Sequence, residues 1–186
     1  AYGRNAVNSN LKLFKIGNQW DANWHGVVSH LLDRHGFASR KATKQLINKI
    51  EELKPDVINL HNIHGYYVNI EILFDYLKKI NIPVVWTFHD CWPFTGHCSY
   101  FDSVACEKWK THCQNCPKKS FYPKSLLIDN SFKNFSDKKQ IFNQLDNLHI
   151  ITPSNWLKNL VKQSFLSKFP VSCIHNGIDL SKFNPV

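Results

Sequence analysis

Polar and titratable residues stand directly after four short apolar segments of this sequence. Imidazole groups exchange protons near neutral pH, and hydroxyl and amide groups bind polar ligands. The residues are His61, Asn62 and His64; His89 and Asp90; Thr152, Pro153 and Ser154; and His175, Asn176 and Gly177. Any one of them is more typical of a helix cap, and Ser154 has the type and position of an N-cap. The occurrence of such groups at four places favours a ligand site.

Four cysteines form a second candidate site, within a loop expected over 91–117. Cys98, Cys106, Cys113 and Cys116 have the spacing C-x7-C-x6-C-x2-C, and the last pair has the short loop of a zinc site. We therefore predict a structural zinc ion, with unligated loop cysteines as the main alternative. A disulfide is typical of secreted proteins, and a redox C-x-x-C normally opens a helix.

A catalytic zinc would recruit a histidine, His97 or His112, in place of a cysteine. Cys91 and Cys173 lie outside the four-cysteine pattern, and we expect both to be buried core thiols.

The elements that carry these residues alternate along the chain. Helical periodicity and turn residues predict helices over 40–53, 69–80, 137–147 and 154–166, and apolar strands over 56–60, 83–88, 148–154 and 170–176. Apolar strands joined by helix-length connections are typical of a parallel sheet covered on both faces. The sequence therefore predicts a doubly wound α/β fold, whose ligands bind beyond the carboxyl ends of the strands.

Length and composition limit the class of protein. A chain of 186 residues is one ordinary domain, and its longest apolar run, at 82–88, is far shorter than the ~20 residues that span a bilayer. A secretion signal is not apparent, so we expect a cytoplasmic protein. The start at Ala1 and the lack of Met favour a piece of a longer protein.

The net charge of +9 fits contact with nucleic acid, anionic lipid or phosphate-bearing molecules, and equally a solvated basic surface. The sequence contains no nucleic-acid recognition signature. A G-x-G motif is also absent, so a nucleotide would be held outside this chain.

Five segments together resemble a known family. They are PDVINLHNIHGYYVNI, TFHDCWPFTGHCSYF, CEKWKTHCQNCP, ITPSNWLKNLVKQSFL and CIHNGIDLSKFNP. In this order they resemble the N-terminal half of bacterial retaining glycosyltransferases of family 4, of the type used in capsule, exopolysaccharide and O-antigen synthesis. The resemblance runs from about Asp33 to the last residue, and NGID followed by F-x-P resembles the signature between the family's two domains.

The resemblance implies half of a two-domain GT-B fold. Residues 1–186 would form one Rossmann-like, acceptor-binding domain, with residues 1–5 at the end of its second strand. The first βα unit would precede the chain, and the domain that binds most of the nucleotide-sugar would follow it. The family needs no metal for catalysis, and the chain alone would be inactive.

The resemblance also implies roles for single residues. His89 matches a histidine that contacts the transferred sugar, and Asp90 would orient its ring. His61, Asn62 and His64 fall where acceptor contacts are expected.

Other matching positions lie later in the chain. Ser154 matches a serine that faces the cleft. Asn176 and Gly177 match the linker motif, in which glycine permits a tight turn and Asp179 caps the next residues. Trp92 would stack on a sugar or pack in the core.

These inferences lead us to expect a hexosyltransferase that moves a sugar from a nucleotide-sugar to a polysaccharide or lipid-linked saccharide. It would work in the cytoplasm, at the inner face of an anionic membrane, without nucleic acid as a partner. Two alternatives stay open: a zinc-stabilised basic module that binds nucleic acid or protein, and a nucleotide-sugar epimerase of similar architecture.

Overall fold

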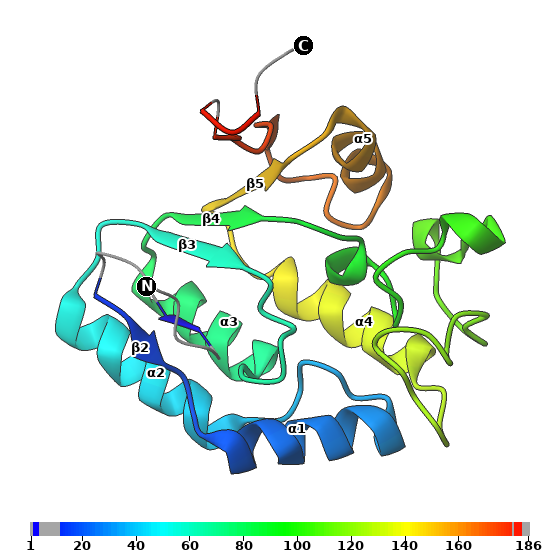
Figure 1. Cartoon of the computed structure of the whole chain (residues 1–186), viewed down its shortest axis with the longest axis horizontal. Coiled ribbons are helices and arrows are strands. Elements are labelled where there is room, and N and C mark those ends of the chain that lie inside the picture. The colour runs from blue at the N-terminus through cyan, green and yellow to red at the C-terminus, as the bar shows by residue number, and fades with distance from the viewer. Residues whose placement is uncertain (1, 4–11, 180, 184–186) are drawn as a thin grey trace.

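A parallel β-sheet forms the centre of the molecule (Figure 1). The computed structural model describes residues 2–3, 12–179 and 181–183. Its main sheet has the order β3 (Ile58–His61), β4 (Val84–Thr87), β5 (Leu148–Thr152) and β6 (Val171–Cys173). All neighbouring strands are parallel, and the register places His61 and Ile151 on either side of Thr87. The predicted Rossmann-like α/β class is confirmed.

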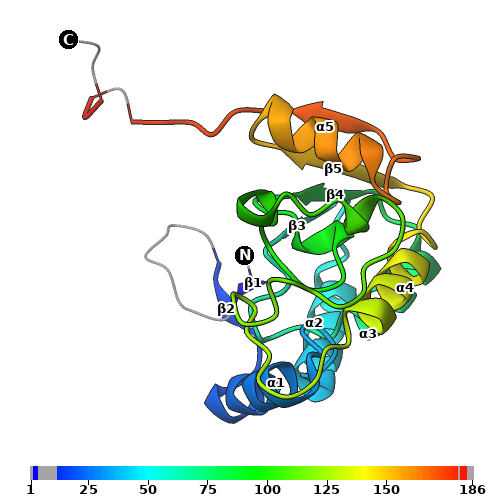
Figure 2. The same cartoon turned by 90° about the vertical axis from the view of Figure 1, so that its right-hand side faces the viewer.

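A second pair of parallel strands lies at the start of the chain, apart from the main sheet (Figure 2). β1 (Tyr2–Gly3) pairs with β2 (Phe14–Lys15). β1 lies within residues 1–5, where the end of a strand was expected, and the other residues of that stretch lie outside the described residues. The place of this strand as the second of the domain stays a prediction.

Five helices and three short 3-10 turns complete the described part. The helices are α1 (Gln19–Leu32), α2 (Arg40–Leu53), α3 (Ile70–Ile80), α4 (Ser131–Phe142) and α5 (Asn155–Gln163). The turns are η1 (Trp92–Phe94), η2 (Asp102–Val104) and η3 (Lys108–Lys110), all between β4 and α4. The helix predicted over 137–147 lies instead at Ser131–Phe142, and α1 was not predicted.

Local sequence signals explain why α3 is where the periodicity places it. The side chain of Asn69 accepts a hydrogen bond from the backbone N–H of Ile72, which caps the first turn. Leu73 and Leu77 are buried on one face of the helix. The helix ends at Asn81, whose φ of 51° lies in the left-handed region, as the predicted turn requires.

The core lies on one face of the main sheet. Each strand from β3 to β6 is added on the same side of the previous one, so right-handed crossovers place α3, α4 and α5 on a common face. The rings of Phe74, Trp86 and Phe142 meet there, with centroids 4.7–5.4 Å apart. On β3 the buried Ile58 and Leu60 alternate with exposed residues. The described strands thus bury one of their faces more deeply than the other, within the predicted α/β class.

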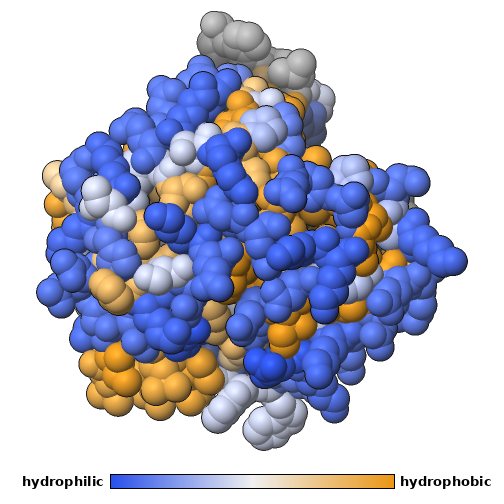
Figure 3. Space-filling model, turned by 180° about the vertical axis from the view of Figure 1, so that it is seen from behind, coloured by the Kyte–Doolittle hydropathy of each residue, from blue (hydrophilic) through white to orange (hydrophobic). Residues whose placement is uncertain are grey.

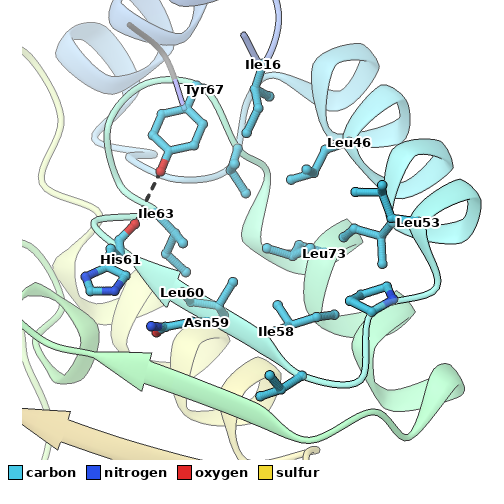
Figure 4. Close-up of a pocket in the computed structure, with 14 residues that line it drawn as sticks. Ile16, Leu46, Leu53, Ile58, Asn59, Leu60, His61, Ile63, Tyr67 and Leu73 are labelled. Atoms are coloured by element: carbon cyan, nitrogen blue, oxygen red, sulfur yellow. Dashed lines mark hydrogen bonds between the residues drawn. The ribbon is translucent and has the colours of Figure 1, made fainter. Parts of the chain in front are cut away.

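An apolar pocket lies beside the outer edge of β3, between that strand and α2 (Figure 4). Ile16, Leu46, Leu53 and Leu73 line it, with Tyr67 and His61 at one end. Apolar walls suit a packed apolar segment better than a sugar. The first βα unit expected from the family resemblance stays a prediction, and its strand would fit against this edge.

Candidate functional site

Two histidines meet at the carboxyl edge of the sheet. His61 is the last residue of β3, and His89 follows the end of the neighbouring strand β4. His61 Nδ1 lies 3.0 Å from His89 Nε2, and the rings are stacked with centroids 5.3 Å apart. Burial, and then the proximity of His89, lower the pKa of His61. A neutral His61 is thus favoured, and in the contact between the two rings one nitrogen donates and the other accepts.

The outer nitrogens of this histidine pair are open to a ligand. Among the described residues, neither His61 Nε2 nor His89 Nδ1 has a hydrogen-bond partner. Each imidazole therefore keeps one nitrogen that can donate to, or accept from, a hydroxyl group.

Two tyrosines hold the backbone of the histidine pair. The hydroxyl of Tyr67 donates to the carbonyl oxygens of His61 and Asn62, at 3.3 and 3.2 Å. The hydroxyl of Tyr100 donates to the carbonyl of His89 at 2.9 Å. Burial raises the pKa of Tyr67 to about 12, so its hydroxyl remains a donor at physiological pH. Asn62 itself is exposed and has a φ of 39°, in the left-handed turn region.

Asp90 pairs with a different histidine from the one expected. Its Oδ2 lies 3.0 Å from His64 Nε2, and its Oδ1 accepts the backbone N–H of Trp92 at 2.9 Å. The chain turns into η1 directly after Asp90, and this turn directs the carboxylate toward His64. The expectation that Asp90 orients His89 was therefore wrong. Trp92 is fully buried and stacks on His64, so it belongs to the core.

A further layer of histidines supports His64, and the sequence patterns did not identify it. His35 Nε2 donates to the carbonyl oxygen of His64. His25 accepts the backbone N–H of Gly36 at 3.0 Å and hydrogen-bonds to Ser39 Oγ at 2.7 Å. Burial, followed by His64 and His25, lowers the pKa of His35 well below its usual value. These residues occupy a stretch without strand or motif signals, so only their packing reveals them.

Ser154 and the linker residues share the sheet edge without contacting the histidine pair in the described structure. Ser154 Oγ accepts the backbone N–H of Leu157 at 3.2 Å, which confirms it as the N-cap of α5. His175 Nδ1 is 2.9 Å from the carbonyl oxygen of Pro153, which joins the ends of β5 and β6.

The linker residues Asn176 and Gly177 are exposed. Gly177 does not have a left-handed φ, and a Cβ there would meet no atom within 4 Å. The tight turn expected at Gly177 is therefore not found. Asp179 accepts the backbone N–H of Ser181 at 3.0 Å, as expected of a cap.

The four cysteines of the predicted zinc site gather around one small pocket. Cys98, Cys106, Cys113 and Cys116 all line it, and the thiols of Cys98 and Cys116 are hydrogen-bonded. All are free thiols. Among the described residues, no three His, Cys, Asp or Glu side chains are already arranged to hold a metal ion. Zinc at this pocket stays a prediction.

The two remaining cysteines differ in burial. Cys91 is fully buried, as predicted, whereas Cys173 is only half-buried.

A comparison with known protein families identifies the family of this chain. The sequence model named Glycosyltransferase Family 4 matches residues 21–182. The chain belongs to glycosyltransferase family 4. It is also 34% identical, over 137 residues, to the putative colanic acid biosynthesis glycosyl transferase WcaC of Escherichia coli K12. That match covers 68% of this chain and 32% of the relative, so the chain spans about a third of that protein. No solved structure matched the chain.

The family match includes the residues at the carboxyl edge of the sheet. The match begins within α1 and includes all of the residues at the ends of β3, β4, β5 and β6. Family membership thus supports glycosyl transfer over the epimerase and the nucleic-acid-binding module considered from the sequence.

Proposed function

We propose that the protein containing this chain transfers a hexose from a nucleotide-sugar to a saccharide acceptor, with retention of configuration, and that this chain forms the acceptor-binding half of a GT-B enzyme. The observation that carries the proposal is the group of His61, His89, His64 and Asp90 at the carboxyl edge of a parallel sheet. Ligands of open α/β sheets bind at this edge. The related E. coli protein is named for colanic acid biosynthesis, which supports a polysaccharide precursor as the product.

The free nitrogens of the histidine pair would bind the reacting sugar. Transfer of a sugar passes through an oxocarbenium-like state, in which partial charges develop on the ring and the leaving group. Donors placed by a rigid framework stabilise such charges because they need little rearrangement. The tyrosine contacts to the backbone of His61 and His89 supply that rigidity. The proposed transfer uses no metal ion.

The nucleotide part of the donor would be held by another domain of the protein. The described loops between strands and helices contain no glycine-rich cradle for phosphates. We therefore expect the isolated chain to lack transferase activity. The opposite side of the cleft would be contributed by the domain that follows the linker residues Asn176 and Gly177.

The decisive experiment is a transfer assay with the full-length protein. It would be incubated with a panel of nucleotide-sugars and lipid-linked saccharide acceptors, with product detection by mass spectrometry and NMR assignment of the new anomeric bond. We expect a retained linkage with the full-length protein and no product with residues 1–186 alone. Epimerisation of the nucleotide-sugar without transfer, or an inverted linkage, would contradict the proposal.

We further propose that the acceptor is lipid-linked and that α1 rests on an anionic membrane. No helix in the described part of the chain is long and apolar enough to cross a bilayer. In α1, polar side chains face the interior and apolar ones face solvent. His25 and Ser29 are buried, while Trp20 and Trp24 are 82% and 63% exposed. Val27 and Leu31 continue the exposed apolar stripe at helical spacing.

The segment after the cysteines extends this surface. His30 contacts the carbonyl oxygen of Lys124 at 2.8 Å, and Leu126 donates its N–H to the carbonyl of His30 at 2.7 Å. Together these elements form the α1 patch, which we define as Trp20, Trp24, Val27, Leu31, Leu126 and Leu127, all exposed. Val27, Leu31 and Leu126 line one open hollow. Figure 3 shows apolar surface at the lower edge of the molecule, where α1 lies.

Basic residues accompany the α1 patch. Lys118, Lys119 and Lys124 belong to the same segment as Phe121 and Leu126. Aromatic and apolar side chains beside lysines are typical of surfaces that lie in the interface of an anionic bilayer. A membrane contact at this face would bring the domain to its lipid-linked acceptor.

A further inference from the structure

An unpaired histidine nitrogen is buried beside the cysteine pocket. His97 is 2% exposed, and its Nδ1 lies 2.5 Å from Asp33 Oδ1. A carboxylate can only accept, so Nδ1 carries the proton of this hydrogen bond. Nε2 is buried and has no partner in the described structure, although His97 lines the same pocket as the four cysteines. A buried polar atom without a partner is costly, and a bound water or metal ion is one way to satisfy it.

Asp33 and His97 have the arrangement of a metal-binding histidine with its carboxylate partner. Histidine ligands usually donate their second N–H to a carboxylate, which fixes the ring and directs the other nitrogen at the metal. Asp33 is itself held in place, because its Oδ2 accepts the backbone N–H of Asn130 at 2.8 Å. Its backbone carbonyl accepts from Asn134 Nδ2 at 2.5 Å. These contacts tie the end of α1 to the start of α4, beneath the pocket.

Hydrogen bonds also hold two of the cysteines in the same pocket. Backbone N–H groups of Gly96 and Lys118 hydrogen-bond to the sulfur atoms of Cys113 and Cys116. The backbone N–H of Cys116 is in turn fixed by Asp129 Oδ2 at 2.6 Å.

We propose that this pocket binds one zinc ion through Nε2 of His97 and the sulfur atoms of Cys98, Cys113 and Cys116, with Asp33 as the residue that orients His97. The set differs from the four cysteines predicted from spacing, because His97 replaces Cys106. Cys98 and Cys116 are in direct contact, and His97 carries the unpaired nitrogen. Three cysteines and one histidine are a common tetrahedral ligand set of structural zinc.

A buried lysine lies close to the proposed zinc ligands. Zinc with three thiolates has a net charge of −1, and the carboxylate of Asp33 adds another negative charge. Lys138 is 1% exposed, and its Nζ donates to the carbonyl oxygens of Trp92 and Thr95 at 2.8 and 3.1 Å. It interacts electrostatically with Cys113, Asp33 and Cys98. Burial lowers the pKa of Lys138 to about 7, and in its charged form the lysine offsets one of these two negative charges.

Zinc binding requires the ligand side chains to rearrange. No three His, Cys, Asp or Glu side chains of the described residues are placed to hold a metal ion, and we propose that the thiols turn to other rotamers on binding. Such a rotation between staggered positions moves a sulfur atom without moving the backbone. Binding would then join the segment over 91–117 to Asp33 and α4, and so stabilise the turn that presents Asp90 to His64.

The experiment measures metal in the full-length protein purified without added zinc. Mass spectrometry of the metal content should show about one zinc per chain. The His97→Ala and Cys98→Ser variants should lose it, whereas Cys106→Ser and the matched control Cys173→Ser should retain it. Less than about a tenth of an equivalent in the unaltered protein would overturn the proposal.

A second measurement avoids variants that fail to fold. The unaltered protein would be alkylated with and without a chelator, and the labelled cysteines mapped by mass spectrometry. We expect zinc to protect Cys98, Cys113 and Cys116 but not Cys106. Equal protection of all four cysteines would contradict the part assigned to His97, and a Cys98–Cys116 disulfide would contradict the metal site altogether.

Discussion

Nδ1 of His61 and Nε2 of His89 lie 3.0 Å apart, at the ends of neighbouring parallel strands. The position of each histidine depends on its own strand, since His61 ends β3 and His89 comes after β4. The two rings meet only because β3 and β4 are adjacent and in register. The contact leaves one nitrogen on each ring for a ligand and requires that at least one ring is neutral. The proposed site for the reacting sugar is thus a coupled pair of imidazoles and not a single histidine.

The first prediction concerns this pair in the full-length enzyme. His89→Ala should lower the transfer rate by about 10²–10³, because it removes a donor positioned at the reacting sugar. His61→Ala should cause a smaller loss of about tenfold, because the His89 ring remains but is no longer held. His149→Gln is the matched control, since His149 lies near the amino end of β5 and hydrogen-bonds to Ser172, away from the carboxyl ends of the strands. Near-normal turnover of His89→Ala would rule out its role.

The second prediction concerns stability against pH. His35 is buried, and its pKa in the folded state lies below the value of 6.5 in the unfolded chain. Between these two values only the unfolded state binds the proton, so the free energy of unfolding decreases as the pH falls below about 6.5. One such group contributes at most about 1.4 kcal/mol per pH unit.

Urea denaturation at pH 7, 6 and 5 would measure this dependence. The His35→Gln variant cannot take up the proton but can still donate to the carbonyl of His64. Its unfolding free energy should therefore decrease less between pH 7 and pH 5 than that of the unaltered protein. Parallel curves for the two proteins would refute the assignment of this pH dependence to His35.

The third prediction concerns the α1 patch. The double change Trp20→Ser and Trp24→Ser should reduce sedimentation with phosphatidylglycerol-containing vesicles by about tenfold or more, since burying an aromatic side chain contributes about 1.5–3 kcal/mol. Binding should also weaken as salt is added, because the lysines act through screened charges. Trp156→Ser is the matched control, as Trp156 is 45% exposed on α5. Equal losses in both variants would argue against α1 as the contact.

The fourth prediction compares two glycines. A Cβ at Gly96 would lie 2.2 Å from the backbone oxygen of Ser131 and 2.7 Å from Cys113 Cβ. Gly96→Ala should therefore cost about 1–3 kcal/mol of unfolding free energy through overpacking. Gly26→Ala should add about 0.5–1 kcal/mol, because Gly26 lies within α1 and its Cβ would meet no atom within 4 Å. Thermal denaturation of both variants checks the opposite signs.

The α/β class and most of its elements could be predicted from the sequence, because their signals are local. Helical spacing and the Asn69 cap define α3, and the apolar segments define β3 to β6. The boundaries of α4 were misplaced by several residues. Lys138 and Asn134 are buried on its inner side, so its core face does not read as apolar. α1 was missed because its apolar side chains face outward while His25 is buried.

The sequence also predicts where strands end, so it identified the residues of the candidate site. It did not predict which side chains these residues contact. Asp90 is next to His89 in the chain, yet it pairs with His64. In the turn into η1 the backbone N–H of Trp92 donates to Asp90 Oδ1, and Oδ2 then faces His64. His35 and His97 were given no role or only an alternative one, since nothing in their spacing shows that they are buried against the backbone of His64 or the carboxylate of Asp33.

The sequence by itself determined the strands, the helices between them and the polar residues at the strand ends, because periodicity, caps and turns depend on neighbours in the chain. The tertiary structure alone decided which of those side chains touch, which nitrogens remain free and which of them are buried without a partner. Hydrogen bonds and burial depend on residues that are distant in sequence, such as Asp33 and His97, and no local pattern records them.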